Sequence, residues 1–244
     1  MTAMRLHRYP SPSGGFALGK MGVGATMLKQ GKTARDYVQS GLVAMWDGIE
    51  NAGWGTHDAS TGRVVDLMGG EPFVLEGNGS ITDKSLAFNG KSATCNRTIS
   101  TFGTVECAFK LTSGRIVFYG CTKYKTSDTS NDFFGIYSSS SGGMFEMCMP
   151  NNNTYVYNPA YQLGNHATIV RSGEDAYKDG LITTAKIARN TWGNQAVINI
   201  GGRVSTTSYD GAGELYAIRI YSRALNAEEI AHNYAIDKER FNLP

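Results

Sequence analysis

Residues 213–241 read GELYAIRIYSRALNAEEIAHNYAIDKERF, a strand pattern followed directly by a helix pattern. The first third is rich in aliphatic and aromatic residues and predicts a strand. Asn226 is a good helix N-cap, and Glu229 stands three residues later, as in a capping box. Small and apolar residues then recur on one helical face, and the basic Arg240 suits a helix C-terminus. The stretch therefore predicts a closing strand and then a helix over 227–238.

Alternation is clearest in residues 105–110, VECAFK, which divide into a Val/Cys/Phe face and a Glu/Ala/Lys face. This pattern is typical of an antiparallel strand with one face in the core and the other in solvent. We expect the closing strand, 214–221, to contribute to the same core. The residues expected to be buried together are Val105, Cys107, Phe109, Ile218 and Ile220.

Turn residues separate many short β-like runs. Residues 176–184, AYKDGLITT, predict a hairpin, because Asp179-Gly180 suits the positive φ angles of a type I′ turn. The chain holds 30 glycines and only 6 prolines, which is typical of short strands joined by tight turns. Trp46 alternates with aliphatic residues in the first predicted strand, so we interpret it as a core residue. The chain is therefore predicted to be an all-β sandwich of two antiparallel sheets with one short C-terminal helix.

Residues 1–36 differ from the rest of the chain, because they are rich in Gly, Ser and Met and show no sustained period. We divide the chain into an N-terminal extension, 1–36, and a sandwich domain, 37–244. The first is expected to be an extended arm that gains order only on another surface. The alternative is a disordered terminus or a cloning remnant. Its candidate partner-binding residues are Phe16, Leu18, Met21, Met27 and Leu28.

Charge and hydropathy argue against several classes of partner. The formal net charge is +2 without a basic block, so we expect no nucleic-acid partner. No run of about 20 apolar residues could span a membrane, and Lys20 interrupts the apolar stretch that a secretory leader would need. Cys95, Cys107, Cys121 and Cys148 form no CxxC motif, and we expect free thiols, as in a protein that folded in a reducing compartment. No cofactor is expected.

Several segments resemble one fold family. The first predicted strand and its exit loop read GLVAMWDGIENAGWG at 41–55, and the segments VVDLMGG, SLAFNG and VECAFKL follow. With the hairpin and the closing segment, they resemble the laminin-G-like, concanavalin-A-like jelly-roll domains, of the kind encoded in gut Bacteroidales and their phages. The resemblance covers about 37–241. It implies two antiparallel sheets, and binding to carbohydrate or protein more often than catalysis.

The closing strand departs from this family at positions that concern metal binding. Many members carry two acids there, in a pattern like IDDVRIY, which help to hold calcium. Tyr216 and Ala217 stand at those positions here. Asp47 and Glu214 remain nearby, but calcium needs six or more oxygen ligands, usually with several carboxylates. No metal is therefore assigned.

Glycoside hydrolases built on the same jelly roll need two carboxylates that flank the scissile bond. On strands, such a pair would appear as alternating acids. Glu106 and Glu146 are single acids in their predicted strands, and the acids within 174–179 fall in a hairpin region where charge is solvated. The motifs of serine hydrolases and of phosphate-binding loops are also missing. We expect no catalytic residues and no enzymatic activity.

Aromatic residues are the better guide to function. Residues 150–161, PNNNTYVYNPAY, place tyrosines beside asparagines, which could stack on a sugar ring and bond its hydroxyls. The alternative is a long loop packed by its own tyrosines. Trp54 lies in a turn after the first strand and is a plausible ligand contact. The candidate ligand-binding residues are Trp54, Asn151, Asn153, Tyr155, Tyr157 and Tyr161.

These observations predict a non-enzymatic binding or structural module. The favoured role is a phage virion surface or accessory protein that attaches to glycans or to other virion subunits. The N-terminal extension would then dock the domain to an oligomer or a larger assembly. The alternative role is a bacterial surface or secreted carbohydrate-binding module, and a third is a structural domain without a ligand.

Overall fold

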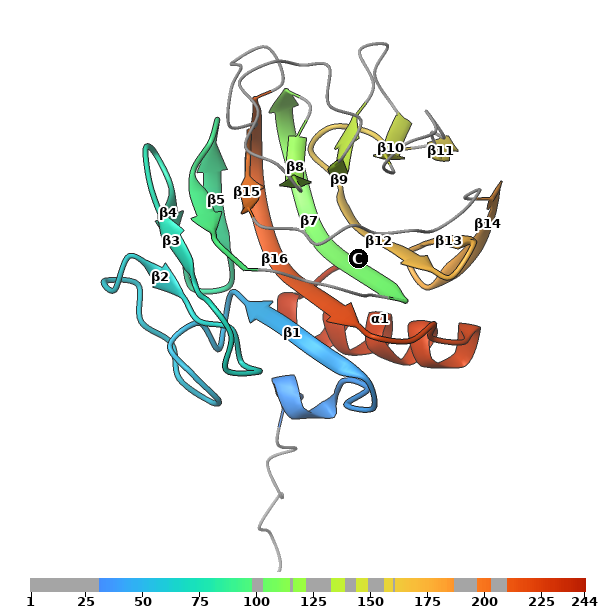
Figure 1. Cartoon of the computed structure of the whole chain (residues 1–244), viewed down its shortest axis with the longest axis horizontal. Coiled ribbons are helices and arrows are strands. Elements are labelled where there is room, and N and C mark those ends of the chain that lie inside the picture. The colour runs from blue at the N-terminus through green and yellow to red at the C-terminus, as the bar shows by residue number, and fades with distance from the viewer. Residues whose placement is uncertain are drawn as a thin grey trace, which may run out of the picture. The chain divides into compact units, whose positions relative to one another are not determined.

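A computed structural model describes residues 31–97, 103–114, 116–121, 133–138, 144–148, 156–159, 161–186, 197–202 and 210–244 of the chain (Figure 1). The predicted partner-binding residues all fall within 1–30, outside the described residues, and their role stays a prediction.

The compact unit begins at Gly31, before the boundary at residue 37 that the sequence analysis places. Thr33 and Asp36 form a capping box around a short 3-10 helix, η1 (Ala34–Asp36). Ala34 is fully buried, and its N–H donates to the Glu50 carboxylate at 2.7 Å. The last residues of the predicted extension are therefore part of the domain.

Two antiparallel sheets, with eight described strands each, face one another across an apolar core. In sheet 1 the strands follow the order β14-β13-β12-β7-β16-β5-β4, and β1 also pairs with β16. Their bounds are β1 Leu42–Asp47, β4 Ser80–Ile81, β5 Leu86–Asn89, β7 Thr104–Gly114, β12 His166–Ser172, β13 Asp175–Lys178, β14 Leu181–Lys186 and β16 Gly211–Tyr221.

Sheet 2 follows the order β11-β10-β9-β8-β15-β6-β3-β2. Its strands are β2 Arg63–Val64, β3 Phe73–Leu75, β6 Ala93–Cys95, β8 Ile116–Cys121, β9 Phe133–Ser138, β10 Met144–Cys148, β11 Val156–Pro159 and β15 Val197–Ile200. The two sheets and the single described α-helix confirm the all-β sandwich that the sequence predicts.

The two longest strands, β7 and β16, have 11 residues each and pair at the centre of sheet 1. The first half of β16 also pairs with β5, and its second half pairs with β1. Both shorter strands therefore lie end to end along one edge of β16. The predicted closing strand is correct in position, and the observed strand begins three residues earlier, at Gly211.

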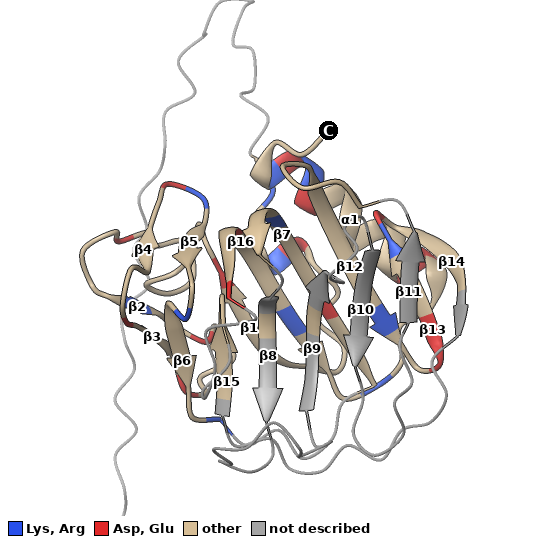
Figure 2. Cartoon of the chain, turned by 90° about the horizontal axis from the view of Figure 1, so that it is seen from above, with Lys and Arg blue, Asp and Glu red and all other residues tan. Residues whose placement is uncertain are grey.

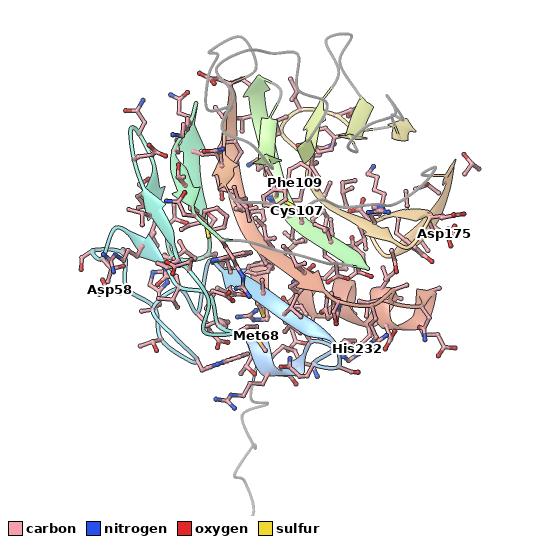
Figure 3. The ribbon with its side chains drawn as sticks, in the orientation of Figure 1. Asp58, Met68, Cys107, Phe109, Asp175 and His232 are labelled. Carbon is pink, nitrogen blue, oxygen red and sulfur yellow. The ribbon has the colours of Figure 1, made fainter. Side chains whose placement is uncertain are left out.

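The core between the sheets confirms the alternating pattern. Val105, Cys107 and Phe109 of β7 are buried there together with Ile218 and Ile220 of β16. Figure 3 shows Cys107 and Phe109 inside the sandwich, whereas Asp58, Asp175 and His232 lie at its periphery. Trp46 is also buried, and its indole N–H donates to the Glu71 carbonyl at 3.1 Å.

Helix α1 (Ala227–Phe241) packs across the other face of sheet 1, against side chains of β1, β12, β13 and β16 (Figure 1). The predicted capping box is confirmed: the Asn226 side chain accepts the Glu229 N–H at 2.9 Å, and the Glu229 carboxylate accepts the Asn226 N–H at 3.0 Å. The helix continues three residues past the predicted end. It stops where Asn242 adopts a left-handed conformation with φ 57°.

One expectation about β7 is wrong. The Glu/Ala/Lys face was expected in solvent, but Glu106 and Ala108 are buried on the side of sheet 1 that α1 covers. Glu106 Oε2 accepts from Arg219 Nε at 2.6 Å and from Asn233 Nδ2 at 2.9 Å. Glu106 can be buried on this face because the groups that it contacts, Arg219 and Asn233, are charged or polar.

The hairpin and two of the thiols agree with the sequence analysis. Asp179 and Gly180 have φ angles of 52° and 79° between β13 and β14, as a type I′ turn requires. Cys95 and Cys107 are buried free thiols, while the side chains of Cys121 and Cys148 are outside the described part.

None of the described helices is long and apolar enough to cross a membrane.

Candidate functional site

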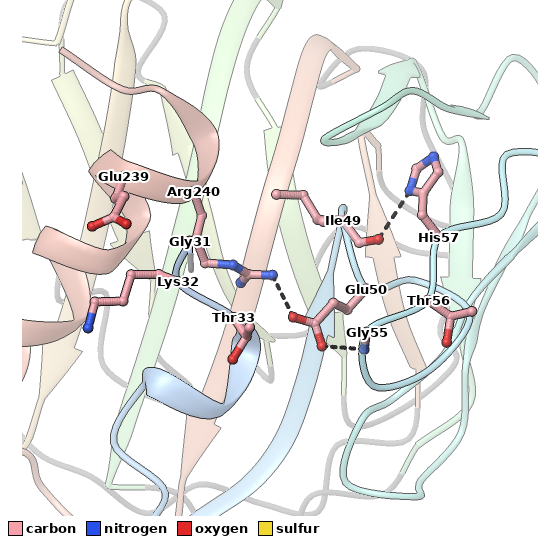
Figure 4. A pocket seen from close by; sticks show the side chains of 10 residues that line it. All are labelled: Gly31, Lys32, Thr33, Ile49, Glu50, Gly55, Thr56, His57, Glu239 and Arg240. Atoms are coloured by element: carbon pink, nitrogen blue, oxygen red, sulfur yellow. Dashed lines mark hydrogen bonds and ion pairs between the residues drawn. The ribbon is translucent and has the colours of Figure 1, made fainter. Parts of the chain in front are cut away.

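A hollow of 360 Å³ opens beside the last turn of α1 (Figure 4). Three segments that are distant in sequence form its walls: the start of the compact unit, the loop after β1 and the end of the helix. We call it the first hollow. Its lining residues are Gly31, Lys32, Thr33, Ile49, Glu50, Gly55, Thr56, His57, Glu239 and Arg240.

The loop after β1 turns sharply because of Asp47 and Gly48. Asp47 Oδ1 accepts the backbone N–H groups of Ile49 at 3.0 Å and Glu50 at 2.9 Å, which is typical of an Asx turn. A Cβ atom at Gly48 would lie 2.1 Å from the Lys84 carbonyl oxygen, so a side chain there would collide with backbone. The turn directs Glu50 toward the helix.

Glu50 joins the three walls at the floor of the first hollow. Its Oε1 accepts the Ala34 N–H at 2.7 Å and Arg240 Nη2 at 3.1 Å, and its Oε2 accepts the Gly55 N–H at 2.7 Å. Glu50 is only 5% exposed. Its carboxylate is therefore a structural acceptor rather than a group presented to a ligand.

Arg240 completes the floor. Its guanidinium donates to both oxygens of Asp47, at 2.6 and 2.9 Å, in a bidentate pair. Burial alone would lower the pKa of Arg240, but the Asp47 carboxylate raises it above the ordinary value. The floor is thus a fixed ion pair network, and it needs no rearrangement to receive a ligand at the rim.

The rim carries groups that remain available. Glu239 has no hydrogen bond or ion pair within the described residues, and Lys32 makes only an exposed ion pair to Asp36 at 3.5 Å. His57 Nδ1 lies 3.1 Å from the Ile49 carbonyl oxygen, which fixes the ring, while Nε2 stays unbonded in the described structure. Together with the Thr56 hydroxyl, these groups offer donors and acceptors for a polar ligand.

Trp54 adjoins this rim, since it directly precedes Gly55. The indole is half-buried and packs against the apolar cluster between sheet 1 and α1 that includes Met45 and Ile230. The Arg35 guanidinium lies 4.9 Å from the ring centroid, within the range of a cation–π contact. Trp54 itself is not among the residues that line the first hollow, although the next residue, Gly55, is.

The structure contradicts the binding role of Tyr161. Its side chain is 1% exposed in the inter-sheet core. The hydroxyl donates to the Asn165 carbonyl at 2.7 Å and accepts the Leu111 N–H at 2.8 Å. Burial raises the pKa of Tyr161 to about 12, so the phenol stays protonated. A tyrosine next to asparagines has the same sequence pattern whether its ring is exposed to a ligand or buried to hold the loop in place.

The other candidate ligand-binding residues cannot be placed in a site. Asn151, Asn153 and Tyr155 lie outside the described residues, and Tyr157 belongs to β11 without a described side chain. No sequence pattern pointed to Glu50 or Glu239 as site residues, or to the ion pairs that Arg240 makes with Asp47 and Glu50. The only local trace of this site is the pair of acids in DGIE, Asp47 and Glu50, at the end of the apolar β1.

The two acids considered as remaining calcium ligands differ in how far their oxygens are engaged: both oxygens of Asp47 are, but only one oxygen of Glu214 is. Asp47 is bound to Arg240, and Glu214 Oε2 accepts from Tyr216 at 3.1 Å. In the portion of the chain with described positions, no three His, Cys, Asp or Glu residues group together in a way that could hold a metal ion.

Several solved structures share the fold at low sequence identity. A Trypanosoma rangeli sialidase in complex with sialic acid aligns at TM-score 0.60 and 15% identity over 81% of this chain. The receptor binding domain of botulinum neurotoxin type G aligns at TM-score 0.59 and 13% identity, also over 81%. Domain 4 of an extracellular arabinanase from Geobacillus stearothermophilus, in complex with arabinotriose, aligns at TM-score 0.50 and 14% identity over 81%. No protein-family model and no curated protein sequence matches the chain.

The alignments differ in how much of each neighbour they cover. The chain spans about a third of the sialidase, 33%, and 52% of the neurotoxin domain, but 100% of the arabinanase domain. Sialidases and an arabinanase domain among the neighbours contradict the expectation that the chain is not an enzyme. Identities this low show only the shared fold, a β-sandwich.

Proposed function

We propose that the chain is a glycan-binding module and that the first hollow holds a sugar unit. The observation that carries the proposal is the geometry of that hollow. Its floor is a hydrogen-bonded ion pair network, while Glu239, Nε2 of His57 and the Thr56 hydroxyl at the rim make no hydrogen bond to any described residue. A few fixed polar groups around a concave surface are what an oriented polar ligand needs.

The half-buried Trp54 supports a sugar in particular. Saccharides present hydroxyls at their edges and C–H groups on their faces, so an indole beside hydroxyl-binding groups matches both. The neighbours add support, because the chain covers the whole of an arabinanase domain solved with arabinotriose. The resemblance to laminin-G-like and concanavalin-A-like domains points the same way.

The setting in which the module works is part of the proposal. We expect a phage particle, with the N-terminal extension attached to virion subunits, and the alternative is a bacterial surface or secreted protein. Co-purification of the chain with capsid or tail proteins supports the first setting. Recovery with the cell surface or the medium instead contradicts it.

The binding proposal is tested by calorimetry with arabinotriose and a panel of other oligosaccharides. Trp54→Ala and Glu239→Gln are expected to weaken binding at least tenfold, because each removes one contact at the rim. Glu228→Gln is the matched control, since it makes the same chemical change in the first turn of the same helix. Equal binding by all variants, or the absence of binding to every glycan, contradicts the proposal.

A further inference from the structure

A second hollow, of 410 Å³, lies on the face of sheet 1 that carries α1. It shares no lining residue with the first hollow: Arg240 lines the first, and the next residue, Phe241, lines the second. Its lining residues are Thr82, Asp83, Lys84, Glu214, Tyr216 and Phe241. The function proposed above makes no use of these residues.

A chain of hydrogen bonds crosses the strands beneath this second hollow. His166 Nε2 lies 2.9 Å from Tyr216 Oη, which lies 3.1 Å from Glu214 Oε2. From the other side, Thr82 Oγ1 lies 2.7 Å from Ser85 Oγ, which lies 3.3 Å from the same Glu214 oxygen. Two chains of polar groups therefore meet at one carboxylate oxygen.

The direction of each proton follows from the carboxylate. A carboxylate only accepts, so the single protons of Tyr216 and Ser85 both go to Glu214 Oε2. His166 must then donate Nε2–H to the Tyr216 oxygen. Burial, followed by the Glu214 charge, raises the pKa of Tyr216, which keeps the phenol proton in place.

This arrangement leaves Glu214 Oε1 as a positioned and unused acceptor. Within the described residues it has no partner, and the ammonium group of the exposed Lys84 has none either. Both residues line the second hollow. The site therefore presents one fixed acceptor and one mobile donor, with the Phe241 ring as part of the wall.

The charges restrict the class of ligand. The carboxylates of Glu214 and Asp83 outnumber the Lys84 ammonium and disfavour an anion, while Glu214 calls for a donor on the ligand and Lys84 for an acceptor. A neutral ligand with a donor next to an acceptor satisfies both groups. Neighbouring hydroxyls on a sugar ring have this property, because one can donate to the carboxylate while the other accepts from the ammonium.

We propose that the second hollow binds a neutral saccharide unit through two adjacent hydroxyls, one donating to Glu214 Oε1 and one accepting from Lys84 Nζ. The choice of a sugar rests on the proposed glycan-binding function, whereas the site is independent of the first hollow. Two sites on one chain would let a long glycan gain avidity without any additional contact.

The test is a residue-resolved NMR titration of the full chain with L-arabinose, D-galactose, arabinotriose and N-acetylneuraminic acid. Neutral sugars are expected to shift the backbone amides of 82–84 and 214–216. Glu214→Gln keeps an acceptor for Tyr216 and Ser85 but can turn the free acceptor into a donor, and it should weaken this binding at least tenfold. Lys84→Met should weaken it as well, and Glu228→Gln should leave it unchanged.

The same spectra separate the two proposals. Shifts confined to 54–57 and 239–240 overturn the second site and leave the first hollow standing. Shifts confined to 82–84 and 214–216 support the second site and overturn the first hollow. Stronger shifts with N-acetylneuraminic acid than with neutral sugars, unchanged affinity in Glu214→Gln, or no shift with any sugar also overturn the second site. The spectra of the free variants report whether each variant is folded.

Discussion

The two faces of sheet 1 are buried by opposite chemistry. Toward sheet 2, the layer consists of apolar side chains such as Cys107, Phe109 and Ile218. Toward α1, the same strands bury charge among apolar side chains: Arg219 binds Asp237 with both terminal nitrogens, at 2.8 and 2.7 Å, and Glu106 with Nε at 2.6 Å. Figure 2 shows charged residues gathered around α1 and the neighbouring strands. We call the first the apolar layer and the second the ionic layer.

The difference shows what each layer contributes. The apolar layer stabilises the sandwich without directional demands, since burial of apolar area depends little on orientation. The ionic layer depends on geometry, because buried charges are tolerated only when each is paired and hydrogen-bonded. That requirement fixes α1 over sheet 1, and through Arg240, Asp47 and Glu50 it also fixes the floor of the first hollow.

The largest effect is expected from breaking the ionic layer. Arg219→Met removes the cation that Glu106 and Asp237 share and leaves two buried carboxylates without their partner. The free energy of unfolding should fall by about 3–5 kcal/mol in urea titrations. Arg223→Met is the control, because its ion pair with Glu229 is partly exposed and such pairs contribute about 0–1 kcal/mol. Similar losses for both variants would contradict the distinction between the layers.

A smaller effect is expected from placing a polar atom in the apolar layer. Ile218→Val removes one methylene from a fully buried side chain and should cost about 0.5–1.5 kcal/mol. Ile218→Thr has nearly the same shape as the valine variant but buries a hydroxyl, which adds about 1–3 kcal/mol. Chemical denaturation of the two variants measures that difference. If Ile218→Thr and Ile218→Val lower the free energy of unfolding by the same amount, water reaches the apolar layer.

The helix cap should contribute less than either layer. Asn226→Ala removes the side-chain acceptor for the Glu229 N–H, and the cost should be about 1 kcal/mol. Thermal unfolding followed by circular dichroism checks this value. Asn226→Gly should be less destabilising than Asn226→Ala. A greater loss of stability in Asn226→Ala than in Arg219→Met would contradict the expected order.

The smallest expected effect concerns pH. Burial, and then the positive charge of Lys110, lower the pKa of His166, while Glu214 and Asp179 oppose the shift. A histidine with a lowered pKa in the folded state contributes stability above its unfolded pKa, about 6.5, and loses it as the pH falls through the folded value. The free energy of unfolding should decrease between pH 7.5 and 5, and His166→Gln should reduce that slope. An unchanged slope in the variant would assign the pH dependence to other groups.

The sequence predicts the apolar layer well because alternation reports it directly. Val105, Cys107 and Phe109, the Asn226 cap and the Asp179-Gly180 turn were all assigned from local patterns. The ionic layer was not predicted, because Glu106 on a strand looks the same whether water or Arg219 surrounds it. Its partners lie 113 and 127 positions away, at Arg219 and Asn233, and no local period links such residues.

None of the residues that line the first hollow was predicted as a ligand contact, and the role of Trp54, next to Gly55 in the chain, stays a prediction. The first hollow combines residues 31–33, 49–50, 55–57 and 239–240, and their meeting depends on buried pairs such as Glu50 and Arg240. The tyrosine- and asparagine-rich segment was favoured because its composition suits a sugar. Tyr161 instead anchors the Leu111 and Asn165 backbone from within the core. Composition could not separate those two roles.

A crystal structure of the chain with the oligosaccharide that binds most tightly tests the central claim most directly. The account predicts a sugar in the first hollow, within hydrogen-bonding distance of Glu239 or His57 and in contact with the Trp54 ring. The Asp47, Glu50 and Arg240 pairs should be unchanged from those described above. A sugar bound at neither hollow, or a first hollow that opens by breaking the Arg240 pairs, would contradict it.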